Sequence, residues 1–431
     1  MTENSRAKCD ELPLVFAAPK SRERVRDLAA DVAGFKDFGQ PTRQLTTEAK
    51  TFAGEPLRVP TFVNEFWTAK QRQASNLHEI SYRACFKPQL PRFFIERLTD
   101  PGDIVYDPFM GRGTTLVEAA LLGRVPAGCD VNPLSITLTR PRLNPPFQRD
   151  VETRLEEIDF AGHREFPEEL LVFYHPETLR EICALKRYLS ERRETPAWDA
   201  VDDWIALVAL NRLTGHSPGF FSVYTMPPNQ AVSAKSQQKI NERRKQTPPR
   251  RDVSRIILKK SRILLSDSTA EVRQRLRAVS GSALLLTGAS WDTPAIASES
   301  VALVVTSPPF LNVVDYAGDN WLRCWFLGID PKAVRISVPG NIEKWQLDMT
   351  KVFRELHRVL KPGGHVAFEV GEVRNGSVKL EEAVLPCGLE AGLEPVLILI
   401  NDQEFTKTAN CWGVDNNTRG TNTNRIVVFR K

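Results

Sequence analysis

The chain has 431 residues, of which 42% are hydrophobic and 26% charged, and this composition excludes both a disordered chain and a membrane protein. Its length suits one large domain or two smaller ones, and its formal net charge of +5 does not by itself indicate a nucleic-acid partner. The polar start lacks the apolar segment of a secretory signal, and no apolar stretch is long enough to span a bilayer. We therefore expect a cytoplasmic protein.

The seven cysteines are odd in number, scattered along the chain and never spaced as C-x-x-C. This distribution argues against a disulfide framework and against a zinc site, so we expect no metal.

Residues 1–60 predict a loosely organised N-terminal arm, because one helical pattern at 21–35 is surrounded by proline, glycine and charged residues. The following segment, 76–99, mixes aromatic and basic residues and then predicts a short helix from Leu90 to Leu98.

Residues 102–133 predict a strand, a tight glycine turn, a helix and a second strand. Gly111 and Gly113 allow the backbone to turn sharply and to approach a ligand, and the helix after them offers unpaired N–H groups. Asp130 ends the second strand 17 residues after Gly113, close to the offset of about 20 at which an acid meets ribose hydroxyls in doubly wound folds. Asp107, just before the loop, could pair with an ammonium group.

The same loop fits two common nucleotide ligands poorly. No lysine follows its glycines as in a phosphate loop, and the third glycine of a dinucleotide fingerprint is replaced by threonine, which argues against ATP and NAD. A ligand that carries ribose, adenine and an amino acid would satisfy all of these positions.

From 146 to 280 helical patterns dominate, with an aromatic loop at 215–230 and then a basic run. The run from Lys235 to Arg262 holds eleven Lys or Arg residues against Glu242 and Asp252. A solvated helix is the common explanation of a charge run, but so large an excess of one sign would also neutralise phosphates. The candidate DNA-binding residues are Lys235, Lys239, Arg243, Arg244, Lys245, Arg250 and Arg251. The loop offers groups that could stack on bases or simply pack on the core: Phe220, Phe221, Tyr224, Pro227, Pro228, Asn229 and Gln230.

Strands alternate with helical patterns again after 283. This alternation implies parallel strand pairing and a sheet covered on both faces, and ligands of such sheets bind beyond the carboxyl ends of the strands. The glycine loop and the sequence TSPPF at 306–310 both follow strands. Because proline has no N–H and a fixed φ, Ser307, Pro308 and Pro309 would form a stiff corner with few donors, although an ordinary proline turn is the simpler reading.

The segments DPFMGRGTT, DVNP, TSPPF and RVLKPGGHVAFEVG resemble the S-adenosylmethionine-dependent DNA amino-methyltransferases, and the serine in TSPPF resembles the members that methylate cytosine N4. The resemblance covers about 76–133 and 283–431 and implies an α/β fold: a Rossmann-like sheet with helices on both faces, ending in an antiparallel strand. We accordingly expect a catalytic domain at 61–145 and 281–431, interrupted by a largely helical, basic region at 146–280 that recognises the DNA target. In most family members the target-recognition region enters the chain at another point relative to the motifs. The sequence therefore does not assign the chain to one of the family's classes of motif order.

The resemblance also implies roles for single residues. Asp107, Gly111 and Gly113 would hold the methionine moiety of S-adenosylmethionine and Asp130 its ribose. Asp292 would hold the adenine, although a solvated turn acid is an equal alternative. The full set of cofactor residues that the resemblance implies is Asp107, Pro108, Phe109, Gly111, Gly113, Thr114, Asp130, Asn132, Asp292, Phe86 and Lys87.

The catalytic residues would be Ser307, Pro308, Pro309 and Phe310. A cytosine amine is a poor nucleophile because its lone pair is delocalised, and acceptors such as Ser307 Oγ and the Pro308 carbonyl would draw it out of conjugation. Phe310 would stack on the base after its removal from the duplex. Methylation at cytosine C5 would instead need a cysteine nucleophile, and Cys387 lies far from both motifs, so we interpret it as structural.

Several alternatives remain at this stage. The same motifs would suit adenine N6 methylation or an RNA base, and a non-catalytic DNA-binding regulator that responds to S-adenosylmethionine is the rival of another class. Residues 410–426 are rich in Asn and Thr and would line the base site or form turns. The expected partner is duplex DNA with a flipped base, and a cognate restriction endonuclease would accompany the enzyme in a restriction–modification system.

Overall fold

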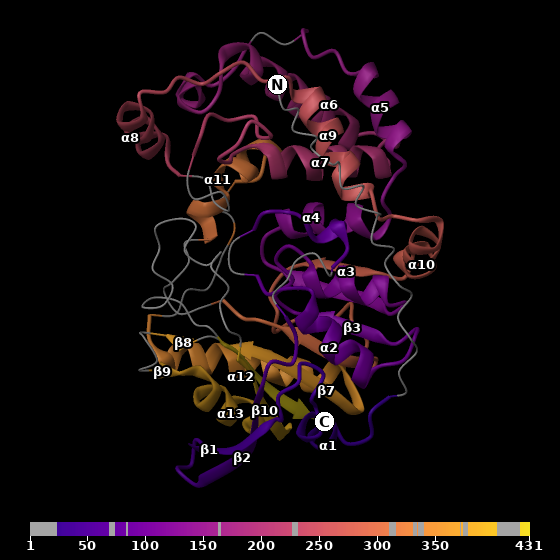
Figure 1. Cartoon of the computed structure of the whole chain (residues 1–431), viewed down its shortest axis with the longest axis vertical. Coiled ribbons are helices and arrows are strands. Elements are labelled where there is room, and N and C mark those ends of the chain that lie inside the picture. Colours follow the sequence, from indigo (N-terminus) through magenta and orange to yellow (C-terminus); the bar gives the residue numbers. More distant parts are fainter. Residues whose placement is uncertain are drawn as a thin grey trace, which may run out of the picture.

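The computed structural model describes residues 24–68, 74–82, 85–162, 165–225, 232–309, 316–330, 334, 340–370, 372–373, 378–402 and 423–431. Within these residues the strands form a nine-stranded sheet in the order β1-β2-β10-β11-β7-β6-β3-β4-β5 and a separate pair, β8-β9 (Figure 1). Their bounds are β1 (Arg43–Lys50), β2 (Pro56–Asn64), β3 (Ile104–Asp107), β4 (Val125–Asp130), β5 (Leu284–Thr287), β6 (Val301–Thr306), β7 (Leu360–Val370), β8 (Glu372–Val373), β9 (Val378–Lys379), β10 (Glu394–Asp402) and β11 (Thr423–Arg430).

The strand directions are those of a Rossmann-like methyltransferase sheet, which confirms the predicted fold class. β5, β4, β3, β6 and β7 are parallel neighbours, whereas β11 lies antiparallel between β7 and β10. The resemblance implied an antiparallel strand at the end of the sheet, and β11 has that direction. All the carboxyl ends of the parallel strands therefore meet at one edge of the sheet.

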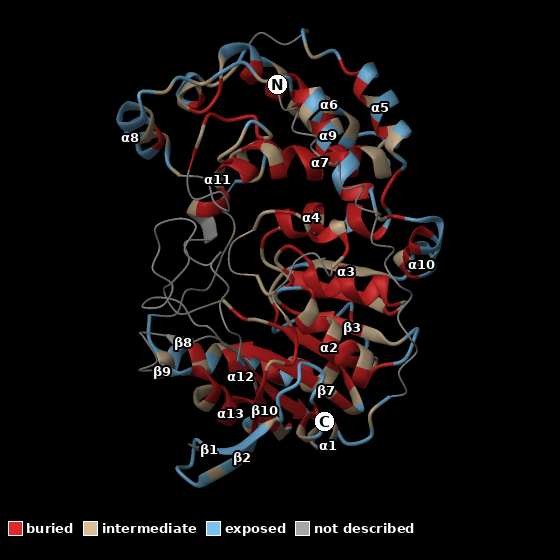
Figure 2. Cartoon of the chain, in the orientation of Figure 1, coloured by how far each residue is buried: buried red, intermediate tan, exposed pale blue. Residues whose placement is uncertain are grey.

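The sheet is buried on both faces, each with its own core (Figure 2). α12 and α13 cover one face, here called the α12 face, where Phe353 packs with Phe368 and Phe429. α1 and α2 cover the other, the α2 face, whose core includes Val305 and Ile426. The helices of this half are α1 (Leu28–Ala33), α2 (Gln89–Leu98), α3 (Thr114–Leu121), α4 (Leu134–Leu143), α12 (Ile342–Val359) and α13 (Leu380–Glu390).

The inserted residues form a helical layer that packs on α3 and α4 and stands beyond the sheet in Figure 1. Leu134 and Leu138 of α4 share a core with Trp204 and Ile257 of the insertion. Helix α11 follows β6 and joins this layer. The helices are α5 (Gln148–Glu157), α6 (Pro176–Arg193), α7 (Ala200–Arg212), α8 (Ala234–Arg244), α9 (Val253–Leu265), α10 (Ala270–Ser280) and α11 (Tyr316–Leu327).

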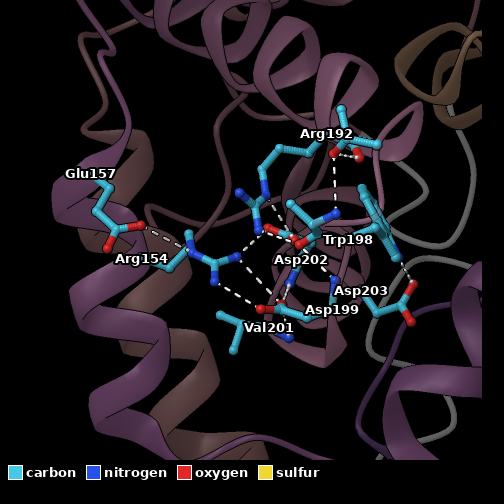
Figure 3. Close-up of polar contacts among 10 residues, drawn as sticks. Arg154, Glu157, Arg192, Trp198, Asp199, Val201, Asp202 and Asp203 are labelled. Atoms are coloured by element: carbon cyan, nitrogen blue, oxygen red, sulfur yellow. Dashed lines mark hydrogen bonds and ion pairs between the residues drawn. The ribbon is translucent and has the colours of Figure 1, made fainter.

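A network of ion pairs ties three inserted helices together (Figure 3). The guanidinium of Arg154 on α5 donates to Asp199 at 2.8 Å and to Asp202 at 2.6 Å, and Arg192 on α6 donates to Asp202 at 2.9 Å. Asp202 is fully buried in the first turn of α7, where it also completes a capping box with Asp199. These charges are satisfied by one another and hold α5, α6 and α7 in place.

The N-terminal segment is more ordered than the sequence indicated. From residue 24 it carries α1 and β1, and the boundary expected at 60 falls inside β2. β2 pairs in parallel with β10, so the β1–β2 hairpin extends the sheet at its edge. Two prolines in β2 and the mostly exposed side chains of β1 explain why no strand was predicted there.

α12 ends at Val359 and β7 begins at Leu360, so Pro362, Gly363 and Gly364 belong to the strand and do not separate it from the helix. A register shift between β6 and β7 accommodates these residues. The C-cap of α7 is Leu213. Among the described residues, none of the helices combines the length and apolar character needed to cross a bilayer.

Candidate active site

The two predicted motifs lie side by side because β3 and β6 are parallel neighbours, with Tyr106 opposite Val304. Asp107 follows Tyr106, and its Oδ1 accepts the hydroxyl of Thr306, two residues beyond Val304, at 2.6 Å. The Thr115 hydroxyl on α3 donates to the Val305 carbonyl at 3.0 Å. The end of β6, where Ser307 follows, is thus joined directly to the end of β3 and to the helix after the glycine loop.

Two glycines shape the loop between β3 and α3. Gly111 and Gly113 both have positive φ, 48° and 74°, and Gly113 is the N-cap of α3. A Cβ on Gly113 would lie 2.2 Å from Thr139 Oγ1 of α4, so only glycine allows this close approach. The loop also rests on β4, because the Met110 N–H donates to the Cys129 carbonyl at 3.0 Å.

The carboxylate of Asp130 fixes the loop to the end of β4. Its Oδ2 accepts the Gly111 N–H at 2.9 Å and its Oδ1 accepts the Asn132 N–H at 2.9 Å. The Asn132 side chain in turn accepts the Leu134 N–H at 3.0 Å and begins α4. Burial raises the pKa of Asp130, and the hydrogen bonds from the two backbone groups oppose that rise.

Asp107 is the most perturbed acid of the loop. Its side chain is buried, and Oδ1 accepts the Phe109 N–H at 3.1 Å in addition to the Thr306 hydroxyl. Burial raises the pKa of Asp107 to about 7, and hydrogen bonds from Thr306, Phe109 and Thr115 lower it only in part. A cation at this carboxylate would stabilise its charged form.

Two arginines that the sequence analysis did not single out hold the segment before α2 against the loop. Arg112 donates to the Ile80 carbonyl at 2.8 Å and to the Phe86 carbonyl at 3.4 Å. Arg142 of α4 is fully buried and donates to the Arg112 carbonyl. The glycine loop and the predicted flanking motif are therefore assembled as one unit, and the only signal of it was the basic residue inside the loop itself.

The remaining predicted cofactor residues occupy varied places. Pro108 is buried and Phe109 half-buried directly after Asp107, and the Thr114 hydroxyl accepts from Arg112 at 3.0 Å. Lys87 is exposed at the start of α2. Asp292 is exposed in the turn after β5, whose Gly288 N–H donates to the Asp130 carbonyl at 3.0 Å.

Ser307 and Pro309 are half-buried and Pro308 is buried, while Phe310 lies outside the described residues. Ser307 directly follows the Thr306–Phe368 pair and so lies beside Glu369 near the end of β7, and Asn424 Nδ2 on β11 donates to Glu369 Oε1 at 3.0 Å. Sequence reasoning missed Glu369, although an acid within the apolar run HVAFEV was a visible signal. Asn424 falls in the Asn-rich tail, most of which lies outside the described residues.

The basic run divides into exposed cations and paired ones. Lys235, Lys239, Arg243, Arg244 and Lys245 are exposed on and just after α8. The Arg244 guanidinium stacks on the Tyr224 ring with 3.8 Å to the centroid. The segment before α8 is linked to α11, since Trp321 Nε1 donates to the Val232 carbonyl at 3.3 Å. These cations therefore sit beside the helix that follows the TSPPF segment.

The last two predicted DNA-binding residues pair with α6. Arg250 donates to Glu177 at 2.7 Å and to Glu181 at 2.5 Å, and the Arg251 backbone exchanges hydrogen bonds with Thr178. The guanidinium of Arg250 and the backbone of Arg251 are thus engaged within the protein.

Two aromatic residues and one cysteine are part of the core. Phe220 and Phe221 of the aromatic loop are buried, so they pack on the body, and residues 226–231 lie outside the described residues. Cys387 is fully buried on α13, and burial raises the pKa of its thiol to about 12. A thiol of that pKa stays protonated, which fits the structural interpretation.

Comparison with known proteins agrees with this geometry. The N6/N4 family model described as DNA methylase matches residues 11–139. Type II methyltransferase M.MjaII from Methanocaldococcus jannaschii is 36% identical over 76 residues, 17% of this chain and 14% of the relative. Type II methyltransferase M.BsoBI from Geobacillus stearothermophilus is 24% identical over 335 residues, 72% of this chain and 63% of the relative. The chain thus spans less than two thirds of the length of these curated relatives.

Among solved structures, the rRNA methyltransferase aviRa from Streptomyces viridochromogenes is 14% identical, with a TM-score of 0.32 over 83% of this chain and 90% of that chain. The family model covers the glycine loop and Asp130, and the longer relative extends the match over most of the chain. The matching model describes N6 and N4 methylases together, so it fits either amine. These comparisons support the DNA amino-methyltransferase family for this chain, with S-adenosylmethionine as the cofactor.

Proposed function

We propose that the chain transfers a methyl group from S-adenosylmethionine to the exocyclic N4 amine of cytosine in DNA. The observation that carries this proposal is the hydrogen bond from Thr306 to Asp107. It joins the end of β6 to the glycine loop, so that Ser307 lies next to the residues proposed to bind the cofactor.

The residues of the loop fit S-adenosylmethionine. The buried Asp107 carboxylate, whose pKa burial raises to about 7, suits the ammonium group of the methionine moiety. Gly113 lets the loop pack directly against Thr139 of α4, and the N–H groups at the start of α3 favour an anionic carboxylate. Asp130 would accept from the ribose hydroxyls, because each carboxylate oxygen that holds a backbone N–H keeps another lone pair.

The cofactor supplies an electrophilic methyl group on a sulfonium. The protein's task is to make the amine nucleophilic and to place it in line. Ser307 Oγ and the Pro308 carbonyl would accept the two amine hydrogens, which draws the nitrogen lone pair out of conjugation with the ring. Because the prolines have no N–H to donate, both acceptors remain directed at the base. Phe310 stays a prediction as the stacking residue.

The target base must leave the duplex to reach this edge of the sheet, at a cost of a few kcal/mol. The exposed cations of α8 would hold the phosphates beside it. We therefore place the DNA-binding surface on Lys235, Lys239, Arg243, Arg244 and Lys245. We leave out Arg250, whose guanidinium pairs with α6, and Arg251, which is half-buried and held to α6 through its backbone.

The experiment incubates the purified chain with labelled S-adenosylmethionine and, in parallel, duplex DNA of diverse sequence, single-stranded DNA and structured RNA. Digestion of the labelled product to nucleosides then identifies the methylated atom. N4-methylcytosine from duplex DNA is the expected product. N6-methyladenine would overturn the choice of base, incorporation into RNA alone would overturn the choice of nucleic acid, and no incorporation would favour a regulator that does not catalyse.

A further inference from the structure

Three polar side chains lie in a row at the carboxyl edge, on the α2 face of the sheet. Thr306 of β6 is paired with Phe368 of β7, and Glu369 of β7 is paired with Ile426 of β11. Side chains alternate between faces along a strand. Val305, Ala367 and Ile426 belong to the core of the α2 face, so the residues two positions nearer the edge share that face: Ser307, Glu369 and Asn424.

Contacts between these side chains follow that placement. Glu369 is 7% exposed, and its Oε1 accepts Asn424 Nδ2 at 3.0 Å. Ser307 lies beside the same carboxyl group, because it follows Thr306 as Glu369 follows Phe368 in the paired strands. Burial raises the pKa of Glu369, and the hydrogen bonds from Ser307 and Asn424 oppose the rise by stabilising the charged form. The neighbours of the buried Glu369 carboxyl group are therefore two neutral side chains, Ser307 and Asn424.

We infer that Glu369 is a positioning residue: it accepts the O–H of Ser307, so that Ser307 Oγ presents only lone pairs to the target amine. The inference rests on the proposed function, since it explains how Ser307 acts as an acceptor. A hydroxyl has one hydrogen and two lone pairs, so the direction of that hydrogen decides whether the group donates or accepts. Without Glu369 the hydroxyl would be free to turn and to donate toward the base.

This arrangement also bears on the choice of substrate atom. An oxygen whose hydrogen is engaged by a carboxylate can accept from an amine, but it cannot donate to a ring nitrogen or a carbonyl oxygen. Ser307 held in this way favours the N–H₂ group of a base over the acceptor groups beside it. Glu369 would therefore contribute to selection of an exocyclic amine without touching it.

A second buried carboxylate on neighbouring elements provides a matched control. Glu381 of α13 is 2% exposed and pairs with Arg425 of β11 at 2.5 Å. Arg425 is the sequence neighbour of Asn424, and its side chain points to the opposite face of the sheet. Glu381→Ala removes a buried acid tied to the same strand, but it leaves Ser307 and its hydrogen bond unchanged.

The test compares the full chain carrying Glu369→Ala, Glu369→Gln or Glu381→Ala with the unmodified chain, by methyl transfer to duplex DNA under saturating substrates. Glu369→Ala should lower kcat about tenfold or more while the Kd for S-adenosylmethionine changes less than about twofold. Glu369→Gln keeps an oxygen that accepts the Ser307 hydrogen and should restore most of the rate. Glu381→Ala should lower the thermal midpoint without lowering kcat.

Three results would overturn the inference: full activity of Glu369→Ala, equal losses in the Ala and Gln variants, or a loss of kcat in Glu381→Ala as large as in Glu369→Ala. Failure of the proposed function is a different outcome, because then the unmodified chain transfers no methyl group to an amine of DNA, or Ser307→Ala stays active. If Ser307→Ala loses activity while Glu369→Ala keeps full activity, the role inferred for Glu369 is wrong but the proposed function stands.

Discussion

The carboxyl edge of the sheet and the inserted helices both bury acids, but they satisfy them with different partners. At the edge, the donors that the structure describes for Asp107, Asp130 and Glu369 are neutral backbone, hydroxyl and amide groups, and burial raises all three pKa values. In the insertion, Asp199 and Asp202 pair with arginines, and the pKa of Asp199 is lowered mainly by its hydrogen bonds to Arg154 and the backbone (Figure 3).

This difference separates a ligand site from a structural one. An acid whose charge is already balanced by arginines attracts a further cation weakly, whereas an acid held by neutral donors still attracts one. The edge is thus where a charged cofactor would bind, and the ion pairs of the insertion keep its helices fixed while other cations on α8 remain exposed. Four experiments test this contrast.

The largest expected effect belongs to the paired acid. Asp202→Ala leaves Arg154 and Arg192 without their buried partner, and breaking such a pair should lower the free energy of unfolding by about 3–5 kcal/mol. Chemical denaturation measures this loss. Glu157→Ala is the control, because Glu157 is an exposed partner of Arg154 and its removal should cost less than about 1 kcal/mol. Equal losses in the two variants would contradict a structural role for the buried network.

Ser307→Ala should have the next largest effect. It should lower kcat without changing the affinity for S-adenosylmethionine. Loss of one directed hydrogen-bonding group in an active site typically lowers kcat about a hundredfold or more. The Kd for S-adenosylmethionine, measured by calorimetry, should stay nearly unchanged because Ser307 is not among the residues proposed to hold the cofactor. Ser300→Ala, just before the other end of β6, serves as the control and should keep the full rate. A fully active Ser307→Ala enzyme would show that another group is the acceptor.

Charge removal on α8 should act on DNA binding only. Replacing Lys239, Arg243 and Lys245 with Gln should weaken duplex binding about twentyfold and reduce the slope of log K against log salt by about 2–3. A single Arg250→Gln change should matter less, because Arg250 already pairs with Glu177 and Glu181.

A control for that experiment removes three exposed cations from the sheet half of the molecule, away from α8 in Figure 1. An equal change of slope in this variant would mean that binding responds to net charge and not to α8. The control residues are Lys36, Lys50 and Arg430.

The smallest expected effect is a pH dependence of cofactor affinity. Since the pKa of Asp107 is raised to about 7, the free protein carries a protonated Asp107 at lower pH, and an ammonium group binds best to the charged form. Affinity for S-adenosylmethionine should rise about tenfold from about pH 6 to about pH 8 as the proton is lost. The same raised pKa makes the free energy of unfolding fall as pH rises from about 4 to about 7, because the carboxyl of the unfolded chain ionises first.

Asp107→Asn should bind more weakly and flatten the affinity profile. The groups that face Asp107 are Thr306, Phe109 and Thr115, with the like charge of Asp130 nearby, so Asp130 is the other acid that could shape the curve. An unchanged pH profile in Asp107→Asn would assign the dependence to Asp130.

The proximity of the two motifs could be predicted from the sequence, whereas their supporting residues could not. Parallel strands end at one edge, so a glycine loop and a Ser-Pro-Pro segment that each follow a strand were expected to lie close together. Glu369 and Asn424 depend on the pairing of β6, β7 and β11, and no local pattern gives the register of strands about 60 residues apart or more. The partners of Arg250 on α6 were hidden for the same reason.

The β1–β2 hairpin shows the opposite limit. Its prolines and its polar, exposed alternation are typical of a loop, and only its place at the edge of a sheet makes these residues acceptable in strands. The β1–β2 hairpin therefore forms because of its pairing with the rest of the sheet, although its local sequence disfavours strands.

The central geometric claim is that cofactor and amine meet where β3 and β6 end. A crystal structure of the chain with S-adenosylmethionine tests it most directly, through the position of the sulfonium methyl carbon. We predict that the ammonium group contacts Asp107 and that the methyl carbon faces Ser307 Oγ across the loop of Gly111 and Gly113. A cofactor bound at another edge of the sheet, or a methyl carbon directed away from Ser307, would contradict the account.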